Sequence, residues 1–301
     1  MKRTCLHALA ALAIVGIAAT PAAQAQTVLT GHHDGSTTSN GYSAAGGTYL
    51  VLADTGGTLD ATFNNNYRFG LTTSGSSTFV ISGGQFSNNG SSGFRNVFGG
   101  STIVSAGQFN NNGGNGVSTS NDVVVVTGGQ FNSNGFYGLV ADKGSNVTVS
   151  GGQFNSNSYG LVITDSGIAV SGGQFIDNSY GLVITNSTAT VTGGQFNNTV
   201  FDFYANPNGT TQSAINIYGQ FDGLTVGQTQ TLPSNAVNGI NGLFTGTLKN
   251  ETASRTYSYR NFGTITLYDV APAPEPSPIA ALTIGLLGLG ALALKARKRI
   301  A

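Results

Sequence analysis

Residues 149–167 read VSGGQFNSNSYGLVITDSG, and the chain then begins the same phrase again as IAVSGGQFIDNSYGLVITNS. A period of about 20–50 residues is typical of a solenoid, in which each repeat buries its apolar face only against its neighbours. Residues 46–226 are therefore predicted to stack as a solenoid. The phenylalanine of the phrase recurs at intervals of 21–25 residues, as Phe63, Phe86, Phe109, Phe131, Phe154, Phe175, Phe196 and Phe221.

The composition of the repeat indicates strands. The units are rich in Gly, Asn, Ser, Thr and Val, and stretches such as residues 146–149 show β-branched alternation where a helical repeat would show a period of about 3.6 residues. The leucine and asparagine frame of leucine-rich repeats is also missing from these units. A unit of about 22 residues, at about 3.3 Å per extended residue, suits three short strands joined by turns. Each unit is thus predicted to be one coil of a parallel β-helix.

Alignment of the units on their phenylalanines places like residues in columns. Like residues of a parallel stack lie about 4.8 Å apart, so apolar columns form a continuous core and an asparagine column forms a ladder of hydrogen-bonded amides. Asn also tolerates the left-handed backbone that a sharp turn between strands requires. Ile or Val stands five residues before each Phe from Phe86 to Phe196. The expected ladder stands three residues after Phe, as Asn66, Asn89, Asn112, Asn134, Asn157 and Asn178.

With these columns the chain resembles the right-handed parallel β-helix proteins of the pectin-lyase-like superfold, in which asparagine ladders and internal aliphatic and aromatic stacks are familiar. The resemblance covers about 180 of the 301 residues. It implies an all-β right-handed parallel β-helix of about eight coils, each of 21–25 residues. It leaves function open, because that fold hosts polysaccharide lyases, hydrolases, adhesins and inert surface proteins.

The segments beside the repeats have other compositions. Residues 26–45 form an N-terminal segment, and residues 227–269 lose the phrase but keep strand-like stretches. An open β-helix end exposes unpaired backbone and apolar stacks, so we expect residues 227–269 to form a β-rich cap. Residues 270–278 contain four prolines and are predicted to be an extended spacer.

The start of the chain is typical of a secretory signal peptide. Lys2 and Arg3 precede an apolar run, and the small-residue pattern at residues 23–25 predicts cleavage near Ala25. Residues 1–25 are therefore predicted to be removed on export. Cys5 would leave with them, so the mature chain would have neither disulfides nor thiol chemistry.

The end of the chain combines three features in order: Pro274-Glu275-Pro276, an apolar run of 17 residues at 278–294, and a basic tail. The run is near the lower limit of about 17–25 residues for a transmembrane helix, and its basic flank should stay cytoplasmic. Residues 274–301 closely resemble the PEP-CTERM sorting signal of Gram-negative bacteria. This resemblance implies processing by an exosortase, transient residence in the inner membrane, and delivery to the cell surface or extracellular matrix.

Charge argues against nucleic acid as a partner. Six of the twelve basic residues lie in the signal peptide and the tail, which leaves six against twelve acidic residues in the exported body. A body with a charge near −6 offers no basic patch for nucleic acid or anionic lipid. We therefore expect no nucleic-acid partner.

The candidates for catalysis are few. Asp142 and Asp165 stand in nearly equivalent positions of adjacent coils with Lys143 beside them, and a β-helix lyase needs clustered carboxylates to hold calcium together with a basic residue. Turns of a solenoid also require Asp and Asn for their geometry, and this structural interpretation is favoured. The pair His32-His33, followed by Asp34, is a weaker candidate for a metal site. Beyond these candidates no catalytic residue, metal site or cofactor is predicted, and calcium stays open as the one alternative.

Two further columns are candidates for recognition. Tyr137, Tyr159 and Tyr180 form a column that suits either a sugar platform or packing at a turn. A neighbouring outward column consists of Val140, Val162 and Val183, which a cap, a partner or a second copy would cover.

The sequence as a whole predicts an exported, non-catalytic β-helix protein of the cell surface or extracellular matrix, with a structural, adhesive or glycan-associating role. The alternative is a polysaccharide lyase or glycosidase that uses the Asp142 and Asp165 face. A third possibility, an ice- or mineral-binding array, needs a regular threonine column. The outward position six before Phe is irregular instead, since it runs Val80, Ile103, Val125, Thr148, Ala169 and Thr190.

Overall fold

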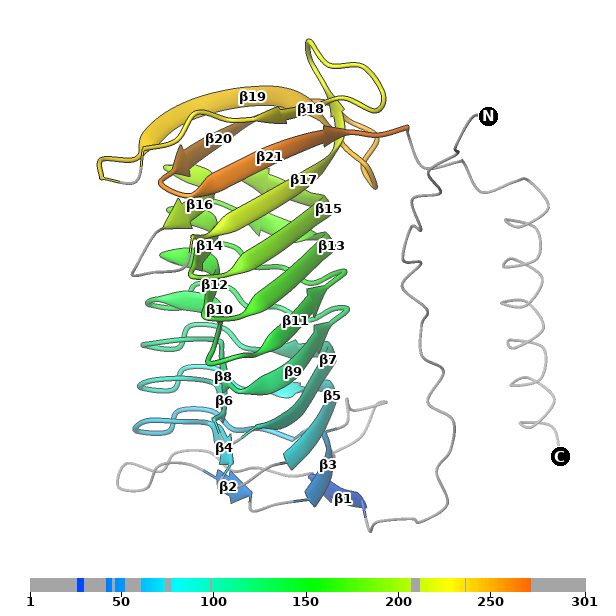
Figure 1. Ribbon diagram of the computed structural model, residues 1–301. Helices are drawn as coiled ribbons and strands as arrows, with labels where there is room; N and C mark the ends of the chain where they lie inside the picture. The colour runs from blue at the N-terminus through cyan, green and yellow to red at the C-terminus, as the bar shows by residue number, and fades with distance from the viewer. Residues whose placement is uncertain are drawn as a thin grey trace, which may run out of the picture.

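The computed structural model describes residues 26–29, 42–44, 47–51, 61–73, 77–97, 99–206, 212–235 and 237–271. These residues form strands and turns with no helix among them. The strands stack coil upon coil along one axis, and a cap lies across the C-terminal end of the stack (Figure 1). Among the described residues we find no apolar helix of the length that a bilayer crossing requires.

One face of the solenoid is a parallel sheet built from a strand of every coil. Each strand pairs with its counterpart one coil away, in register over the residues that correspond in the repeat. The strands are β1 (Gln26–Leu29), β3 (Gly47–Val51), β5 (Ser77–Gln85), β7 (Gly100–Gln108), β9 (Asp122–Val126), β11 (Asn146–Val149), β13 (Gly167–Ile176), β15 (Thr188–Asn197), β17 (Ala214–Phe221) and β21 (Thr264–Asp269).

A second parallel sheet forms another face of each coil. Tyr137 pairs with Tyr159 and Tyr159 with Tyr180, so the tyrosine column lies on this sheet. The strands are β2 (Tyr42–Ala44), β4 (Leu71–Thr73), β6 (Phe94–Asn96), β8 (Val117–Ser120), β10 (Tyr137–Asp142), β12 (Tyr159–Thr164), β14 (Tyr180–Thr185), β16 (Phe201–Asn206) and β20 (Arg255–Asn261).

The core is a column of stacked phenylalanines flanked by aliphatic columns. From Phe63 to Phe196, successive rings lie 4.5–5.1 Å apart between centroids and within 4–13° of parallel. All of these rings are almost fully buried. On the strands, alternate residues face inward, as in β11, where Val147 and Val149 are buried and Thr148 is partly exposed. The core therefore grows by one phenylalanine and a few branched aliphatic residues with each coil.

The asparagine column forms a continuous line of hydrogen bonds at one corner. Asn112 donates both its backbone N–H and its side-chain amide to Oδ1 of Asn134, at 3.1 and 2.9 Å, and every neighbour from Asn66 to Asn178 repeats this pattern. The line ends in Asn198 and Asp202. These side chains are 0–4% exposed from Asn66 to Asn178, so the ladder satisfies amides that water does not reach.

From the sequence we expected the ladder asparagine to adopt the left-handed backbone conformation at this corner. The structure shows that another residue adopts it. It is the residue just before, such as Ser133 with φ of 57°, which directs the asparagine inward. The column of left-handed residues is Asn65, Asn88, Asn111, Ser133, Ser156 and Asp177.

The C-terminal region both extends and closes the solenoid. β20 and β21 add one further strand to each parallel sheet, through pairings such as Phe203 with Tyr259 and Ile217 with Leu267. β19 (Ile240–Leu248) and β18 (Thr229–Thr231) then pair antiparallel with these strands, and Phe244 packs on Tyr257 at 5.1 Å. This arrangement covers the end of the phenylalanine stack with aromatic rings.

The phenylalanine stack is shorter than the sequence count suggests. It makes six turns from Phe63 to Phe196. The ring of Phe203, which pairs with Leu182 on the second sheet, then lies 4.7 Å from Phe196 and is tilted by 46°. Phe221, the last copy in the sequence, instead packs against Phe244 in the cap, because residues 219–221 pair antiparallel with β19. The strand of this coil, β17, still pairs parallel with β15, and only its end at Phe221 belongs to the closing structure.

Several predicted features lie outside the described residues. They are the signal peptide at residues 1–25, the His32-His33-Asp34 cluster, most of the spacer at 270–278, and the tail at 274–301 with Pro274, Glu275 and Pro276.

Candidate functional site

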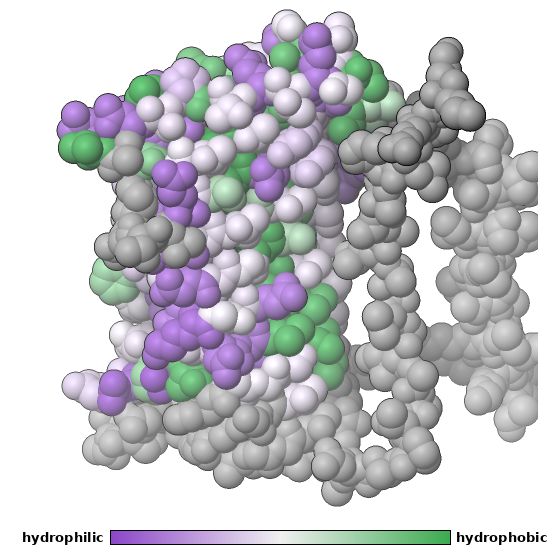
Figure 2. All heavy atoms as spheres, in the orientation of Figure 1, coloured by the Kyte–Doolittle hydropathy of each residue, from purple (hydrophilic) through white to green (hydrophobic). Residues whose placement is uncertain are grey.

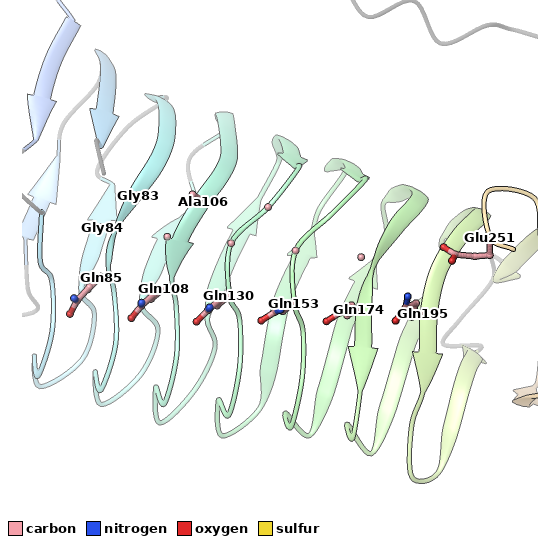
Figure 3. Close-up of a pocket in the computed structure, with 15 residues that line it drawn as sticks. Gly83, Gly84, Gln85, Ala106, Gln108, Gln130, Gln153, Gln174, Gln195 and Glu251 are labelled. Atoms are coloured by element: carbon pink, nitrogen blue, oxygen red, sulfur yellow. The ribbon is translucent and has the colours of Figure 1, made fainter. Parts of the chain in front are cut away.

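A groove runs parallel to the solenoid axis along the turn between the first sheet and the buried phenylalanines. It has a volume of about 740 Å³. One glutamine from each of six coils borders it, and Figure 3 shows these side chains projecting in a row. At about 4.8 Å per coil the row is about 24 Å long. The glutamines are Gln85, Gln108, Gln130, Gln153, Gln174 and Gln195, and Glu251 lies at the C-terminal end.

Glycines make most of the floor of the groove, and Ala106 takes the place of a glycine in one coil. At most of these positions the turn leaves little room for a side chain. Gly129 has a φ of 96°, and a Cβ on the preceding Gly128 would collide with the Ser105 carbonyl oxygen of the coil before. A bare backbone floor results, which lets another chain approach closely. The left-handed position recurs in each coil just before the glutamine, at Gly84, Gly107, Gly129, Gly152, Gly173 and Gly194.

The backbone of each glutamine is used within the solenoid. Gln130 donates its N–H to the Gly107 carbonyl at 2.9 Å, and its carbonyl accepts from the Phe109 N–H at 2.7 Å. Its side chain is exposed, and its amide oxygen receives one bond from Asn110 at 3.3 Å. The inward phenylalanine that follows it fixes the direction of the glutamine outward, since neighbouring strand residues face opposite ways. The amides thus form a fixed array along the groove.

The floor also presents backbone donors. At the last coil, the Gly194 N–H donates to Oε1 of Glu251 at 2.8 Å. In the equivalent positions of earlier coils, Gly129 and Gly152 have N–H groups with no acceptor among the described residues. Glu251 therefore occupies at one end a position that is open along the middle of the groove.

Glu251 is held in the groove by the turn of the cap. Its neighbour Asn250 donates its backbone N–H to the Thr192 carbonyl at 2.7 Å and its side chain to the Ser171 carbonyl at 3.3 Å. These bonds anchor residues 249–251 against the side of the stack. The cap thereby sets where the groove ends.

The charge of the groove is low. Among the residues that line it in the described part of the chain, Glu251 is the one ionisable group. Glycoside hydrolysis ordinarily uses two carboxylates, and metal-assisted cleavage needs a ligand cluster. The described residues contain no group of three or more His, Cys, Asp or Glu side chains placed to hold a metal. The arrangement suits hydrogen bonding to an extended chain.

Asp142, Lys143 and Asp165 lie at another corner, away from this groove. The structure corrects the equivalence of the two aspartates, because the pairing aligns Asp165 with Lys143 and Asp142 with Thr164. Lys143 and Asp165 are left-handed, with φ of 55° and 49°, and Asp165 accepts from Asn186 at 3.1 Å. One extra residue between Phe131 and Tyr137, compared with Phe154 to Tyr159, accounts for the offset.

The tyrosine column stacks ring upon ring. Tyr159 and Tyr180 lie 4.9 Å apart at 11°, and Tyr137 meets Tyr159 edge to face at 5.4 Å. Burial, and then the neighbouring phenols, raise the pKa of Tyr159. Stacked sugars need exposed ring faces, whereas neighbouring rings cover the faces in the middle of this column. This geometry favours packing along the sheet over a sugar platform.

Valines continue this surface beside the tyrosines. Val140 pairs with Val162 and Val162 with Val183, and Tyr204 follows in the same column, with the Arg260 guanidinium 5.8 Å from its ring. Val183 is 6% exposed. On the first sheet, the outward column begins with Val80, Ile103 and Val125 and continues with threonine and alanine on the later strands. Figure 2 shows hydrophobic residues gathered over the early strands of that face. Neither column is a regular threonine array.

One buried carboxyl was not predicted from the sequence. Asp122 is 2% exposed, and its Oδ2 accepts from the Thr102 hydroxyl at 2.6 Å and the Asn96 amide at 3.1 Å. Its Oδ1 has no hydrogen-bond partner. Desolvation raises the pKa of Asp122 from 3.8 to about 6, against the opposing effect of these bonds.

The groove itself was also missed, although the sequence carries its signal. Gly-Gly-Gln or Ala-Gly-Gln precedes the phenylalanine in coil after coil. Constancy at the glycines indicates a turn, and constancy at an outward polar position, where the core imposes no choice, indicates a surface array.

Comparison with known proteins agrees with this architecture. Residues 30–196, more than half of the chain, match the family model described as "Right handed beta helix region". No match was found among curated proteins or among solved structures. On the family match and the parallel coils together, the chain belongs to the right-handed β-helix family.

Proposed function

We propose that this protein is an exported, non-catalytic β-helix protein of the bacterial surface or extracellular matrix, which associates with an extended glycan. The observation that carries the proposal is the straight row of six glutamines over a glycine floor. The row presents the same amide group once in every coil, so it suits a polymer that presents the same chemical groups at regular intervals along its length. Polysaccharides are the polymers that meet this condition in a matrix.

The ends of the chain supply the proposed route to the surface. The signal-peptide pattern at residues 1–25 supports export, and the PEP-CTERM resemblance of residues 274–301 supports an exosortase as processing partner. The apolar run at 278–294 would hold the protein in the inner membrane until it is processed. Neither a cofactor nor a nucleic-acid partner is proposed for this protein.

The alternative of a lyase or glycosidase draws less support. Asp142 and Asp165 do not line the groove, and they occupy different positions of their coils. Their surroundings are those of turn residues, with Lys143 and Asp165 at left-handed positions. Glu251 is the one carboxylate among the described residues that line the groove, and it accepts a hydrogen bond from the Gly194 backbone N–H. These observations favour binding without cleavage.

The test measures binding and cleavage together. The full chain, extracted in detergent, is presented to a panel of neutral and anionic polysaccharides, and both retention and release of new chain ends are followed. We expect retention by at least one polysaccharide without release of chain ends. Cleavage would establish the enzymatic alternative, and failure to retain any polysaccharide would refute a glycan-associating role.

A further inference from the structure

The chemistry of the groove restricts the class of polymer that it accepts. Each coil offers a primary amide, which donates and accepts hydrogen bonds, as Gln130 and Gln153 do at the centre. The coils at the centre also offer the N–H groups of Gly129 and Gly152, which have no acceptor among the described residues. A sugar hydroxyl is likewise both donor and acceptor, so such groups pair in either direction.

We infer that the groove binds a neutral, hydroxyl-rich glycan whose chain lies along the solenoid axis, with a side chain of every coil bonding to it. This inference rests on the proposed function and names the class of glycan. It goes beyond the fold, since β-helix proteins act on polymers of many kinds.

Charge is the reason to choose a neutral polymer. A polyuronate carries a carboxylate on each sugar, and its recognition calls for Arg, Lys or a bound cation. The residues that line the groove in the described part include no Arg, Lys or His. The carboxylate of Glu251 adds a negative charge at one end, and the exported body is acidic overall. A polyanion would find no positive partner among the described lining residues and would meet repulsion at the Glu251 end.

Glu251 shows how the floor binds an oxygen. Its Oε1 accepts from the Gly194 N–H at 2.8 Å, so an oxygen atom sits in the groove at hydrogen-bond distance from the backbone. The equivalent places over Gly129 and Gly152 are of the same kind, and no described residue fills them. We therefore place ligand hydroxyls there.

The experiment is affinity gel electrophoresis of the full chain in a non-ionic detergent. The gels contain hydroxyethyl cellulose, xyloglucan or dextran as neutral probes, and polygalacturonate as the anionic probe. The test variant is Gln130→Ala with Gln153→Ala. The matched control is Gln220→Ala with Gln230→Ala, which removes two exposed amides of the cap that lie outside the groove. Thermal unfolding midpoints confirm that both variants are folded.

We expect at least one neutral probe to retard the native chain, with little change between low and high salt because no ion pair is involved. The test variant should bind that probe at least about tenfold more weakly, since two hydrogen-bonding groups are lost, while the control should be unchanged. Gln130→Lys with Gln153→Lys should lose the neutral probe and gain retardation by polygalacturonate at low salt.

The outcomes separate the inference from the proposed function. Retardation of the native chain by polygalacturonate and by no neutral probe overturns the inference and leaves the proposed function standing. Neutral binding that the test variant keeps also overturns it, because the ligand then lies elsewhere. If neither kind of polysaccharide retards the native chain, the proposed function itself fails.

Discussion

Asn134 donates its side-chain amide to Oδ1 of Asn157 at 3.1 Å, so each coil supplies the acceptor for the amide of the coil before it. The same amide nitrogen also donates to the Phe109 carbonyl at 2.9 Å. A single asparagine thus joins three coils. Its loss affects more than one hydrogen bond.

Asn134→Ala is expected to lower the free energy of unfolding by about 1–3 kcal/mol or more, because it leaves the two buried donors of Asn112 and the Phe109 carbonyl without the partners that Asn134 supplies. Chemical denaturation measures the change. Asn146→Ala is the control, since Asn146 is exposed at the start of β11. Equal losses in the two variants would show that the ladder contributes nothing beyond a surface amide.

Asp122 should make stability depend on pH in a direction opposite to that of most carboxylates. Its pKa is raised from 3.8 to about 6, so between these values the folded chain holds a proton that the unfolded chain has released. The contribution of Asp122 to stability is therefore greatest below about pH 4 and declines as the pH rises through about 6.

Asp122→Asn removes this dependence, because the amide cannot ionise and keeps an oxygen for the Thr102 and Asn96 donors. We expect the variant to unfold at a higher temperature than the native chain at pH 7.5 and at nearly the same temperature at pH 4. Scanning calorimetry at both values makes the comparison. A difference that is the same at both would mean that Asp122 is not protonated in the fold.

Asp142→Asn with Asp165→Asn should leave calcium affinity and any depolymerising activity unchanged, since the two residues occupy different positions of the corner. Titration calorimetry with calcium chloride and an assay of new chain ends check this. A loss of activity by orders of magnitude is what removal of an acid–base pair or metal site produces, and it would restore the lyase alternative.

Residues 274–301 are predicted to act as a sorting signal. Deletion of residues 274–301 should release a folded body into the periplasm and deplete it from the surface fraction. Alanines in place of Pro274, Glu275 and Pro276 should leave the protein in the membrane and uncut. Mass and cell fraction of the native chain and both variants, measured in the host, test this. A native chain that keeps its tail, with equal surface abundance in all three, would reduce the segment to an ordinary anchor.

The stack could be predicted because its residues repeat for a local reason. A phenylalanine that lies 4.5–5.1 Å from its copies in the coils above and below has the same surroundings in each coil, so the same residue serves in every coil. The cap offers no such rule. Tyr259 and Leu267 continue the two sheets next to Phe203 and Ile217, but different side chains do the packing there and the spacing departs from the period.

Positions at corners were harder to predict for a different reason. Counting from phenylalanine makes Asp142 and Asp165 equivalent, and one inserted residue near the exposed Phe136 shifts the strand that follows. Asp122 depends on Asn96 and Thr102 from the preceding coil, a combination that occurs once in the described stack. A side-chain arrangement that occurs once produces no repeating pattern in the sequence from which it could be predicted.

The spacing between neighbouring glutamines in the row equals the spacing between neighbouring coils, because each coil contributes one glutamine. Residues 159–164 and 180–185 are identical, YGLVIT, and pair in register one coil apart. Duplication of one such 21-residue unit would lengthen the row by one amide, and the same Glu251 turn would still close it. The length and the chemistry of the row are thereby set independently in this molecule. The number of coils sets how long the row is, while the single residue before each phenylalanine sets which chemical group the row presents.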